Sequence, residues 1–356
     1  MNRSNNSPDH LLPDKCAPQH ERAPRPLPLF LELVRSVGEK EPELARAALD
    51  GLAKYERAER LKGRPRRPTA TQVGPAALHD FGGEGQPAVL VPSLINPPHV
   101  LDLDEEVSLC IAVAGMGRRA LLLDWGNARH RADLDIGGHV ERLLVPLLED
   151  LGEPAGLIGY CLGGTMAVAA ANFTELERVA TIAAPWRFAG YPKDSRSSLA
   201  ELWKAARLAA DRLNVLPMEV LQAAFWSLDP HRTVSKFARF AEIETGSPDA
   251  LRFVTLEDWA NEGEPLPLPA ARELIEDLFG SDLPGRGEWK IAGRTTTDAI
   301  SAPLLNFTSS HDRITPDSSA AHGDREEIAA GHVGMVVGSA RSQLHRGLER
   351  FLGDAR

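Results

Sequence analysis

The sequence predicts an α/β fold in which a doubly wound, mostly parallel sheet is interrupted by a helical insertion. Short apolar runs alternate with helical patterns between residues 88 and 184, as in parallel βαβ units. The alternation stops at residue 187 and returns at residue 303. We therefore expect one sheet, built from two separate parts of the chain, with a helical cap over one edge.

Composition and charge narrow the class of protein. The chain has 356 residues, of which 43% are hydrophobic and 25% charged, as in soluble globular proteins with a sizeable core. Its net charge of −10 argues against a nucleic-acid partner. No apolar stretch approaches the roughly 18 residues of a transmembrane segment, and the polar start does not resemble a secretory signal. We expect a cytoplasmic enzyme or binding protein.

Two segments precede the predicted sheet. Residues 1–28 are polar and proline-rich and are expected to form a disordered arm. Residues 29–69 comprise two amphipathic helices, broken near residues 38–42, and a basic, proline-containing linker.

The pattern of apolar runs and helical stretches after residue 69 predicts where the core and the cap lie. The core is predicted at 70–186 and 299–356, and the cap at 187–298, which holds four of the six tryptophans. A second packed domain without catalytic role is the alternative for the cap. In chain order, we predict strands at 88–91, 120–124, 155–159 and 179–184, alternating with helices at 103–114, 138–151 and 162–172, then strands at 303–309 and 327–329 and a helix at 339–352.

The segment Gly159-Tyr160-Cys161-Leu162-Gly163-Gly164 lies between a predicted strand and a predicted helix. This is the setting of the nucleophile elbow of α/β-hydrolases, with Cys in place of Ser. A thiol at a helix N-terminus is favoured as the thiolate, which is the nucleophilic form. The N–H groups of Leu162 and of Leu94, in the loop after the first predicted strand, are the expected oxyanion donors. The alternative is that Cys161 is a small buried hydrophobe.

We expect structural roles for the other two cysteines. Cys16 falls in the predicted arm and Cys110 on the apolar face of a predicted helix, and the three cysteines have no disulfide or metal-site spacing.

A cysteine nucleophile needs a base, and the base needs a group that orients it. Asp312 follows the strand predicted at 303–309, and His332 lies between Gly331 and Gly334 before the last helix. The order nucleophile, acid, histidine matches α/β-hydrolases. A metal site using His311 and His322 with these two residues lacks the usual ligand spacing, so we expect no metal.

Several motifs then occur in order along roughly residues 70 to 356. They are Val91-Pro92-Ser93-Leu94-Ile95-Asn96 with Leu101-Asp102-Leu103, Asp124-Trp125-Gly126, the box around Cys161, Gly293-Arg294, His311-Asp312-Arg313-Ile314-Thr315-Pro316 and Gly331-His332-Val333-Gly334. In these motifs the chain resembles polyhydroxyalkanoate (poly-3-hydroxybutyrate) synthases, most closely the class III catalytic subunit. The Gly-x-Cys-x-Gly-Gly box is the most specific, because ordinary hydrolases carry Ser there.

The resemblance implies transfer of 3-hydroxyacyl groups from coenzyme A thioesters to a growing polyester. It implies Cys161 as the acyl-carrying nucleophile, His332 as the base and Asp312 as the third catalytic residue. It also implies no bound cofactor, since coenzyme A is released from the substrate, and a second synthase subunit as partner. We further expect a homo-oligomer and granule association. A thioesterase or polyester depolymerase with the same triad, and a non-catalytic granule-associated protein, remain as alternatives.

An acidic protein that binds coenzyme A needs a local positive site for its phosphates. Arg129, Arg131 and Arg187 follow the C-terminal ends of predicted strands, where ligands bind in such sheets. We predict that one of them holds the nucleotide, with solvated arginines as the alternative.

Overall fold

An eight-stranded sheet forms the centre of the molecule in a computed structural model that describes residues 23–60, 64–65 and 67–353. Its strand order is β1-β2-β4-β3-β5-β6-β11-β12, with β2 antiparallel to both neighbours and the other pairs parallel. This confirms the predicted fold class. The strands are β1 (Thr69–Val73), β2 (Ala76–Asp80), β3 (Pro87–Val91), β4 (Arg119–Asp124), β5 (Ala155–Tyr160), β6 (Leu176–Ile182), β11 (Leu304–Thr308) and β12 (Asp324–Glu327).

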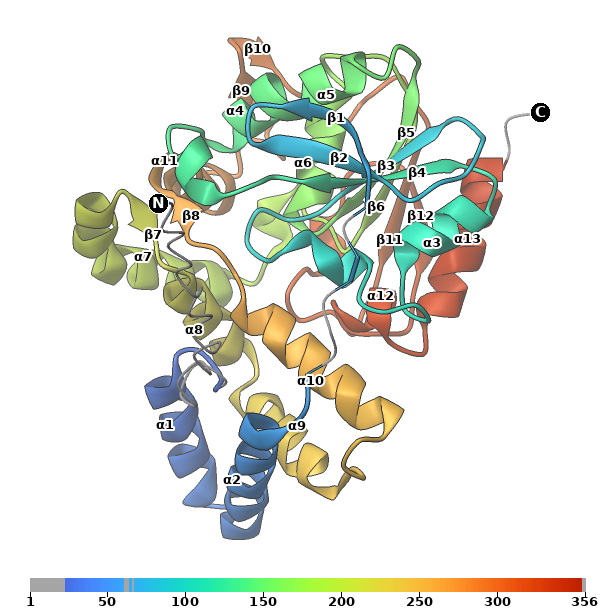
Figure 1. The fold of residues 1–356 in the computed structure, drawn as a ribbon. Coiled ribbons are helices and arrows are strands. Elements are labelled where there is room, and N and C mark those ends of the chain that lie inside the picture. Colours follow the sequence, from blue (N-terminus) through green and yellow to red (C-terminus); the bar gives the residue numbers. More distant parts are fainter. Residues whose placement is uncertain (1–22, 61–63, 66, 354–356) are drawn as a thin grey trace, which may run out of the picture.

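Helices cover both faces of the sheet (Figure 1). Alternate residues of β3 enter opposite clusters, since Val89 and Val91 belong to one apolar core and Ala88 and Leu90 to the other. One face carries α3 (Leu109–Gly115), α12 (Gly334–Val337) and α13 (Arg341–Gly353), and the other carries α4 (Ile136–His139), a π-helical turn (Val140–Leu144), α5 (Val145–Glu149) and α6 (Leu162–Ala170).

Three local features differ from the predictions, and one is the strand expected at 327–329, which spans Asp324–Glu327 (β12). The helix expected at 103–114 begins only at Leu109, because Asp102 and Ser108 form an isolated bridge and the Ser108 hydroxyl caps the helix by accepting from the Ile111 N–H. The hairpin of β1 and β2 was not predicted. Strand β1 reads Thr-Ala-Thr-Gln-Val and is largely exposed, so it lacks the apolar alternation that marks a half-buried strand.

The cap predicted at 187–298 contains four α-helices of eleven residues or more. Its helices are α7 (Lys193–Leu213), α8 (Met218–Leu228), α9 (Pro230–Glu242) and α10 (Pro248–Asn261). The following segment, α11 (Leu268–Arg272) with a π-helix (Glu273–Gly280), buries Leu274 and Leu278 in the core cluster of α4 and α6, which α7 and α8 also enter. Two short ladders complete the region, β7 (Val215–Leu216) with β8 (Leu266–Pro267) and β9 (Lys290–Ile291) with β10 (Arg294–Thr295).

The N-terminal helices α1 (Leu27–Gly38) and α2 (Pro42–Arg57) pack on the cap, as Figure 1 shows below the sheet. Phe30 and Tyr55 share a buried cluster with Phe237 of α9. Helices α2 and α9 cross so closely that a Cβ on Gly51 would lie 1.9 Å from the Phe237 carbonyl oxygen. The N-terminal helices and the cap therefore form one helical unit.

The predicted disordered arm, 1–28, is corrected at its end. Ala23 is buried, and the Arg25 N–H donates to Asn261 Oδ1 of α10 at 3.0 Å, so the last six residues are held on the cap. Residues 1–22 lie outside the described part of the chain. In the part that is described, no helix has the length and apolar character needed to cross a bilayer.

Candidate active site

Cys161 stands at the turn between β5 and α6. Its backbone has φ 54° and ψ −132°, a conformation that costs a non-glycine residue of the order of 1–3 kcal/mol. The Cys161 N–H donates to the Ile182 carbonyl of β6 at 2.9 Å, which holds the turn against the sheet. Such a turn lifts a side chain out of the sheet edge, and Cys161 is partly exposed while Cys110 is fully buried.

Glycines around Cys161 are required by close backbone contacts. A Cβ on Gly159 would lie 2.4 Å from the Gly164 Cα, and a Cβ on Gly163 would lie 2.1 Å from the Val91 carbonyl oxygen. The start of α6 therefore rests directly on the end of β3. This contact brings the loop after β3 beside the turn that carries Cys161.

The His332 ring is oriented by Asp312. His332 Nδ1 lies 2.8 Å from Asp312 Oδ2, although the two residues are 20 positions apart. The other oxygen, Oδ1, accepts from the N–H groups of Ile314 and Thr315 at 2.8 and 3.0 Å, so the carboxylate is held by its own loop. With Nδ1 hydrogen-bonded to Asp312, Nε2 is left to face a second partner.

The charges around His332 favour its protonated form. Burial by itself lowers the pKa of this imidazole, but Asp312 and then Cys161 outweigh that effect and raise the pKa to about 10. The Tyr160 ring lies beside the imidazole, with ring centroids 5.2 Å apart. Burial and the nearby Cys161 and Asp312 raise the pKa of the Tyr160 hydroxyl, which therefore stays neutral.

Cys161, Asp312 and His332, predicted from three separate segments, line one cavity of about 300 Å³ between the core and the cap. Its core wall comes from the loop after β3 and from the two loops that carry Asp312 and His332. Half of the twelve cap residues in its wall are apolar or aromatic, and these are Phe225, Trp226, Leu228, Leu256, Trp259 and Ala260.

The loop after β3 is held from both sides. Trp125 Nε1 donates to the Pro92 carbonyl at 3.0 Å, and Trp259 Nε1 of the cap donates to the Pro97 carbonyl at 2.9 Å. Between them, the Ile95 N–H donates to Ser93 Oγ at 3.3 Å, which leaves the neighbouring Leu94 N–H as the better oxyanion candidate.

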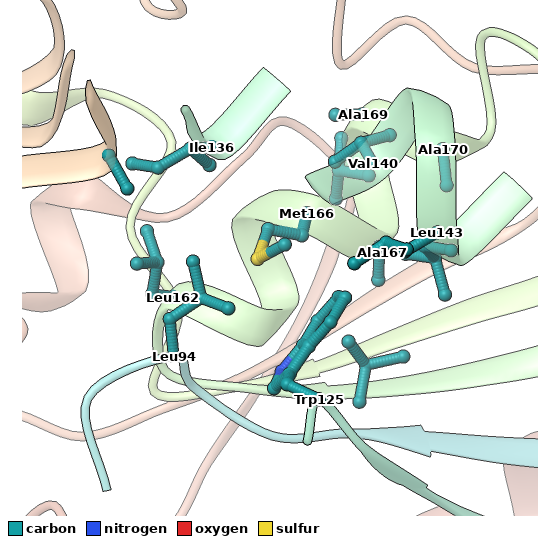
Figure 2. Packing of buried hydrophobic residues seen from close by; sticks show 14 of the residues in the cluster. Leu94, Trp125, Ile136, Val140, Leu143, Leu162, Met166, Ala167, Ala169 and Ala170 are labelled. Carbon is teal, nitrogen blue, oxygen red and sulfur yellow. The ribbon is translucent and has the colours of Figure 1, made fainter. Parts of the chain in front are cut away.

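Leu94 and Leu162 are both buried, and their side chains enter the apolar cluster around Met166 and Trp125 (Figure 2). The side chains are thus anchored in the core, and only the backbone N–H groups of these two residues can serve a site at the sheet edge.

The arginines predicted to bind phosphate do not line the cavity. Arg131 is 3% exposed, and its guanidinium contacts the Gly126 carbonyl, His139 and Glu264. Arg187 binds Asp298 at 2.5 Å and the Ala320 carbonyl at 2.8 Å. Both arginines therefore join structural elements. Arg129 is exposed but is no part of the cavity wall.

Sequence reasoning missed the charged residues of the cap. Arg232 and Lys236 of α9 and Glu257 of α10 line the cavity, together with Arg313 next to Asp312. Lys236 Nζ pairs with Glu257 at 2.7 Å. The spacing of Arg232, Lys236 and Arg239 could have indicated one basic helix face, but not which surface that face meets.

Among the described residues, no group of three His, Cys, Asp or Glu side chains is arranged to hold a metal ion. His311, next to Asp312, is exposed.

No protein-family model matches the chain. Over 280 residues, 72% of its length, it is 27% identical to the poly(3-hydroxyalkanoate) polymerase subunit PhaC of Haloarcula marismortui, of which 58% is covered. It is 25% identical over 291 residues, 75% of its length, to the subunit of the same name from Allochromatium vinosum, of which 81% is covered. The match thus spans less than two thirds of the haloarchaeal protein.

Among solved structures, epoxide hydrolase A from Mycobacterium thermoresistibile superposes with a TM-score of 0.52 and 16% sequence identity, covering 82% of this chain and 99% of that one. At this identity the likeness concerns the fold. By sequence the chain is similar to the poly(3-hydroxyalkanoate) polymerase subunits named PhaC, and by structure it has the α/β-hydrolase fold.

Proposed function

We propose that the protein is an acyltransferase that polymerises 3-hydroxyacyl groups from coenzyme A thioesters, with a thioester on Cys161 as the intermediate. The observation that carries the proposal is the single cavity shared by Cys161, His332 and Asp312 in a relative of PhaC polymerase subunits. Cytoplasmic location, granule association and a second subunit belong to the same proposal.

In the first half-reaction, His332 holds the proton and the adjacent sulfur attacks as a thiolate. The attack on the thioester carbonyl gives a tetrahedral oxyanion, which the N–H groups of Leu162 and Leu94 would stabilise. The carbon–sulfur bond to coenzyme A then breaks, and His332 gives its proton to the departing thiolate. The acyl group is left on Cys161 as a thioester.

In the second half-reaction, neutral His332 accepts the proton of an incoming hydroxyl group. The hydroxyl oxygen attacks the acyl carbonyl, the bond to Cys161 breaks, and the sulfur returns to the thiolate beside protonated His332. The product is an ester one unit longer. Asp312 keeps the imidazole oriented through both steps and stabilises its charge.

The nature of the cap wall favours a hydroxyl acceptor over water. Trp226, Leu256 and Trp259 make the cap side of the cavity largely apolar, and such a wall disfavours bulk water near the acyl group. The cavity is also small, at about 300 Å³, which suits a short acyl unit.

The test is incubation of the purified protein with 3-hydroxybutyryl-coenzyme A. Thiol release, the mass of the intact protein and the size of the product are followed together. Thiol release with an acyl adduct on Cys161 and polymer as product is expected. Free hydroxyacid in place of polymer would make the protein a hydrolase, and no thiol release and no adduct would overturn the proposal.

A matched pair of variants separates chemistry from folding. Cys161→Ala is expected to abolish both thiol release and the adduct. Cys110→Ala, which removes a thiol buried in α3 away from the cavity, is expected to retain both. Activity that survives Cys161→Ala would exclude the mechanism.

A further inference from the structure

A second hollow lies beside the active-site cavity at the start of α9. Asp229, Arg232 and Arg313 belong to the walls of both spaces, and His231, Ser235 and Arg239 complete the second. We call this hollow the basic mouth, after its three arginines, Arg232, Arg239 and Arg313. It lies next to the cavity of Cys161, because the two spaces share three wall residues.

The arginines converge from two elements. Arg232 and Arg239 are seven residues apart on α9, so they lie on one face, about 10 Å apart along the helix axis. Arg313 follows Asp312 in the loop after β11. The guanidinium of Arg232 also reaches the His332 loop, because a Cβ on Gly331 would lie 3.4 Å from one of its nitrogens.

The positive charge of the basic mouth is largely uncompensated. In residues 23–60, 64–65 and 67–353, no carboxylate forms an ion pair with Arg232 or Arg239, and both are exposed. Arg313 pairs with Asp229 at 3.2 Å, but its side chain is 67% exposed, and such a pair contributes only about 0–1 kcal/mol. Lys236 nearby is matched by Glu257.

This arrangement suits a particular kind of ligand. One guanidinium group can bind two phosphate oxygens at once. A cluster of uncompensated arginines also attracts a polyanion locally, even in a protein of net charge −10. The basic mouth shares Arg232 and Arg313 with the wall of the cavity that contains Cys161. The matching ligand has an apolar reactive end and a phosphorylated end.

We propose that the basic mouth binds the phosphate groups of the thiol that leaves during acyl transfer, that is, the phosphorylated nucleotide part of coenzyme A. This inference rests on the proposed function. An acidic partner protein could also bind exposed arginines, but the wall that the basic mouth shares with the cavity favours a small phosphorylated molecule.

The experiment measures binding without turnover. Cys161→Ala protein is titrated calorimetrically with coenzyme A, 3′-dephospho-coenzyme A, pantetheine and inorganic phosphate. The same titrations are made with Arg232→Gln and Arg239→Gln added singly. Arg212→Gln is the matched control, because Arg212 is an exposed cap arginine at the end of α7 and lines neither space.

Each test variant is expected to weaken coenzyme A binding roughly tenfold, the loss of one charge-assisted phosphate contact. Pantetheine affinity is expected to stay unchanged in all variants, and Arg212→Gln is expected to bind coenzyme A normally. Inorganic phosphate is expected to bind far more weakly than coenzyme A.

Three results would overturn the inference: unchanged coenzyme A affinity in both test variants, an equal loss in Arg212→Gln, or phosphate binding as tight as that of coenzyme A. The last would indicate a general anion site, and binding of an acidic protein would then be the remaining role. The proposed function fails separately, through absence of thiol release from acyl-coenzyme A.

Discussion

Trp259 of the cap donates a hydrogen bond from Nε1 to the Pro97 carbonyl of the core at 2.9 Å. The bond joins α10 to the loop that carries Leu94, and Trp125 holds the other end of the same loop through Pro92. The cap thus contributes to the position of a loop that lies beside Cys161, in addition to covering it.

Replacing Trp259 by Phe tests this link. Trp259→Phe keeps an aromatic ring but removes the donor of a part-buried hydrogen bond, which contributes about 0.5–1.5 kcal/mol. We expect thiol release from acyl-coenzyme A to fall several-fold, mainly in kcat, because the oxyanion loop shifts while the cavity remains apolar.

Trp203→Phe is the control for that variant. Trp203 also lies in the cap and donates to Glu276 at 2.8 Å, but it is no part of the cavity wall. An equal fall in kcat for both variants would mean that cap stability, and not the loop, is responsible.

The His332 pKa gives a prediction for stability against pH. Burial lowers this pKa, but Asp312 and Cys161 raise it to about 10, against 6.5 as the ordinary value. The folded protein therefore holds a proton that the unfolded chain releases between about pH 6.5 and 10. The stabilisation is complete below this interval and is lost as the pH rises through about 10.

Denaturant unfolding between pH 6 and 10 measures this effect. The free energy of unfolding of the wild type is expected to fall with rising pH more steeply than that of His332→Gln. Parallel curves for the two proteins would show that His332 does not titrate as expected.

Gly163→Ala is expected to be strongly destabilising. The new methyl group would lie 2.1 Å from the Val91 carbonyl oxygen, and neither α6 nor β3 can move without disturbing the core. Overpacking of this kind costs about 1–3 kcal/mol or more.

Gly115→Ala, at the end of α3, provides the comparison. No atom lies within 4 Å of the Cβ position there, so we expect equal or slightly higher stability. Thermal unfolding of the two variants measures the difference, and a Gly163→Ala protein as stable as Gly115→Ala would contradict the close packing of the nucleophile turn.

The pair of Lys236 and Glu257 in the cavity wall can be tested by a double-mutant cycle. Nζ lies 2.7 Å from Glu257, which is 7% exposed. Unfolding of Lys236→Met, Glu257→Gln and the double variant is expected to give a coupling of about 0.5–3 kcal/mol, because removing one partner leaves the other charge unpaired. If the stability losses of the two single variants add up to the loss of the double variant, the pair has no energetic coupling.

Local patterns predicted much of the fold. Strands β3, β4, β5 and β6 are apolar runs that are bounded by turn residues and buried on both faces. Such a run can be recognised from adjacent residues alone. The turn at Cys161 could be predicted for the same reason, because its glycines lie next to the cysteine in the chain. Close backbone contacts require glycine at these positions. The polar, exposed strand β1 carried no such signal.

The sequence by itself determined the alternation of strands and helices between residues 88 and 184, the turn that presents Cys161, and the loops that carry Asp312 and His332. Those features follow from residue type and spacing along a short stretch of chain. Only the tertiary structure decided that α1 and α2 join the cap, that Arg131 and Arg187 are held in internal contacts, and that Arg232 and Arg239 face the cavity mouth. The physical reason is that a helix face or a long cationic side chain acquires its neighbours from packing between distant segments, which local spacing does not specify.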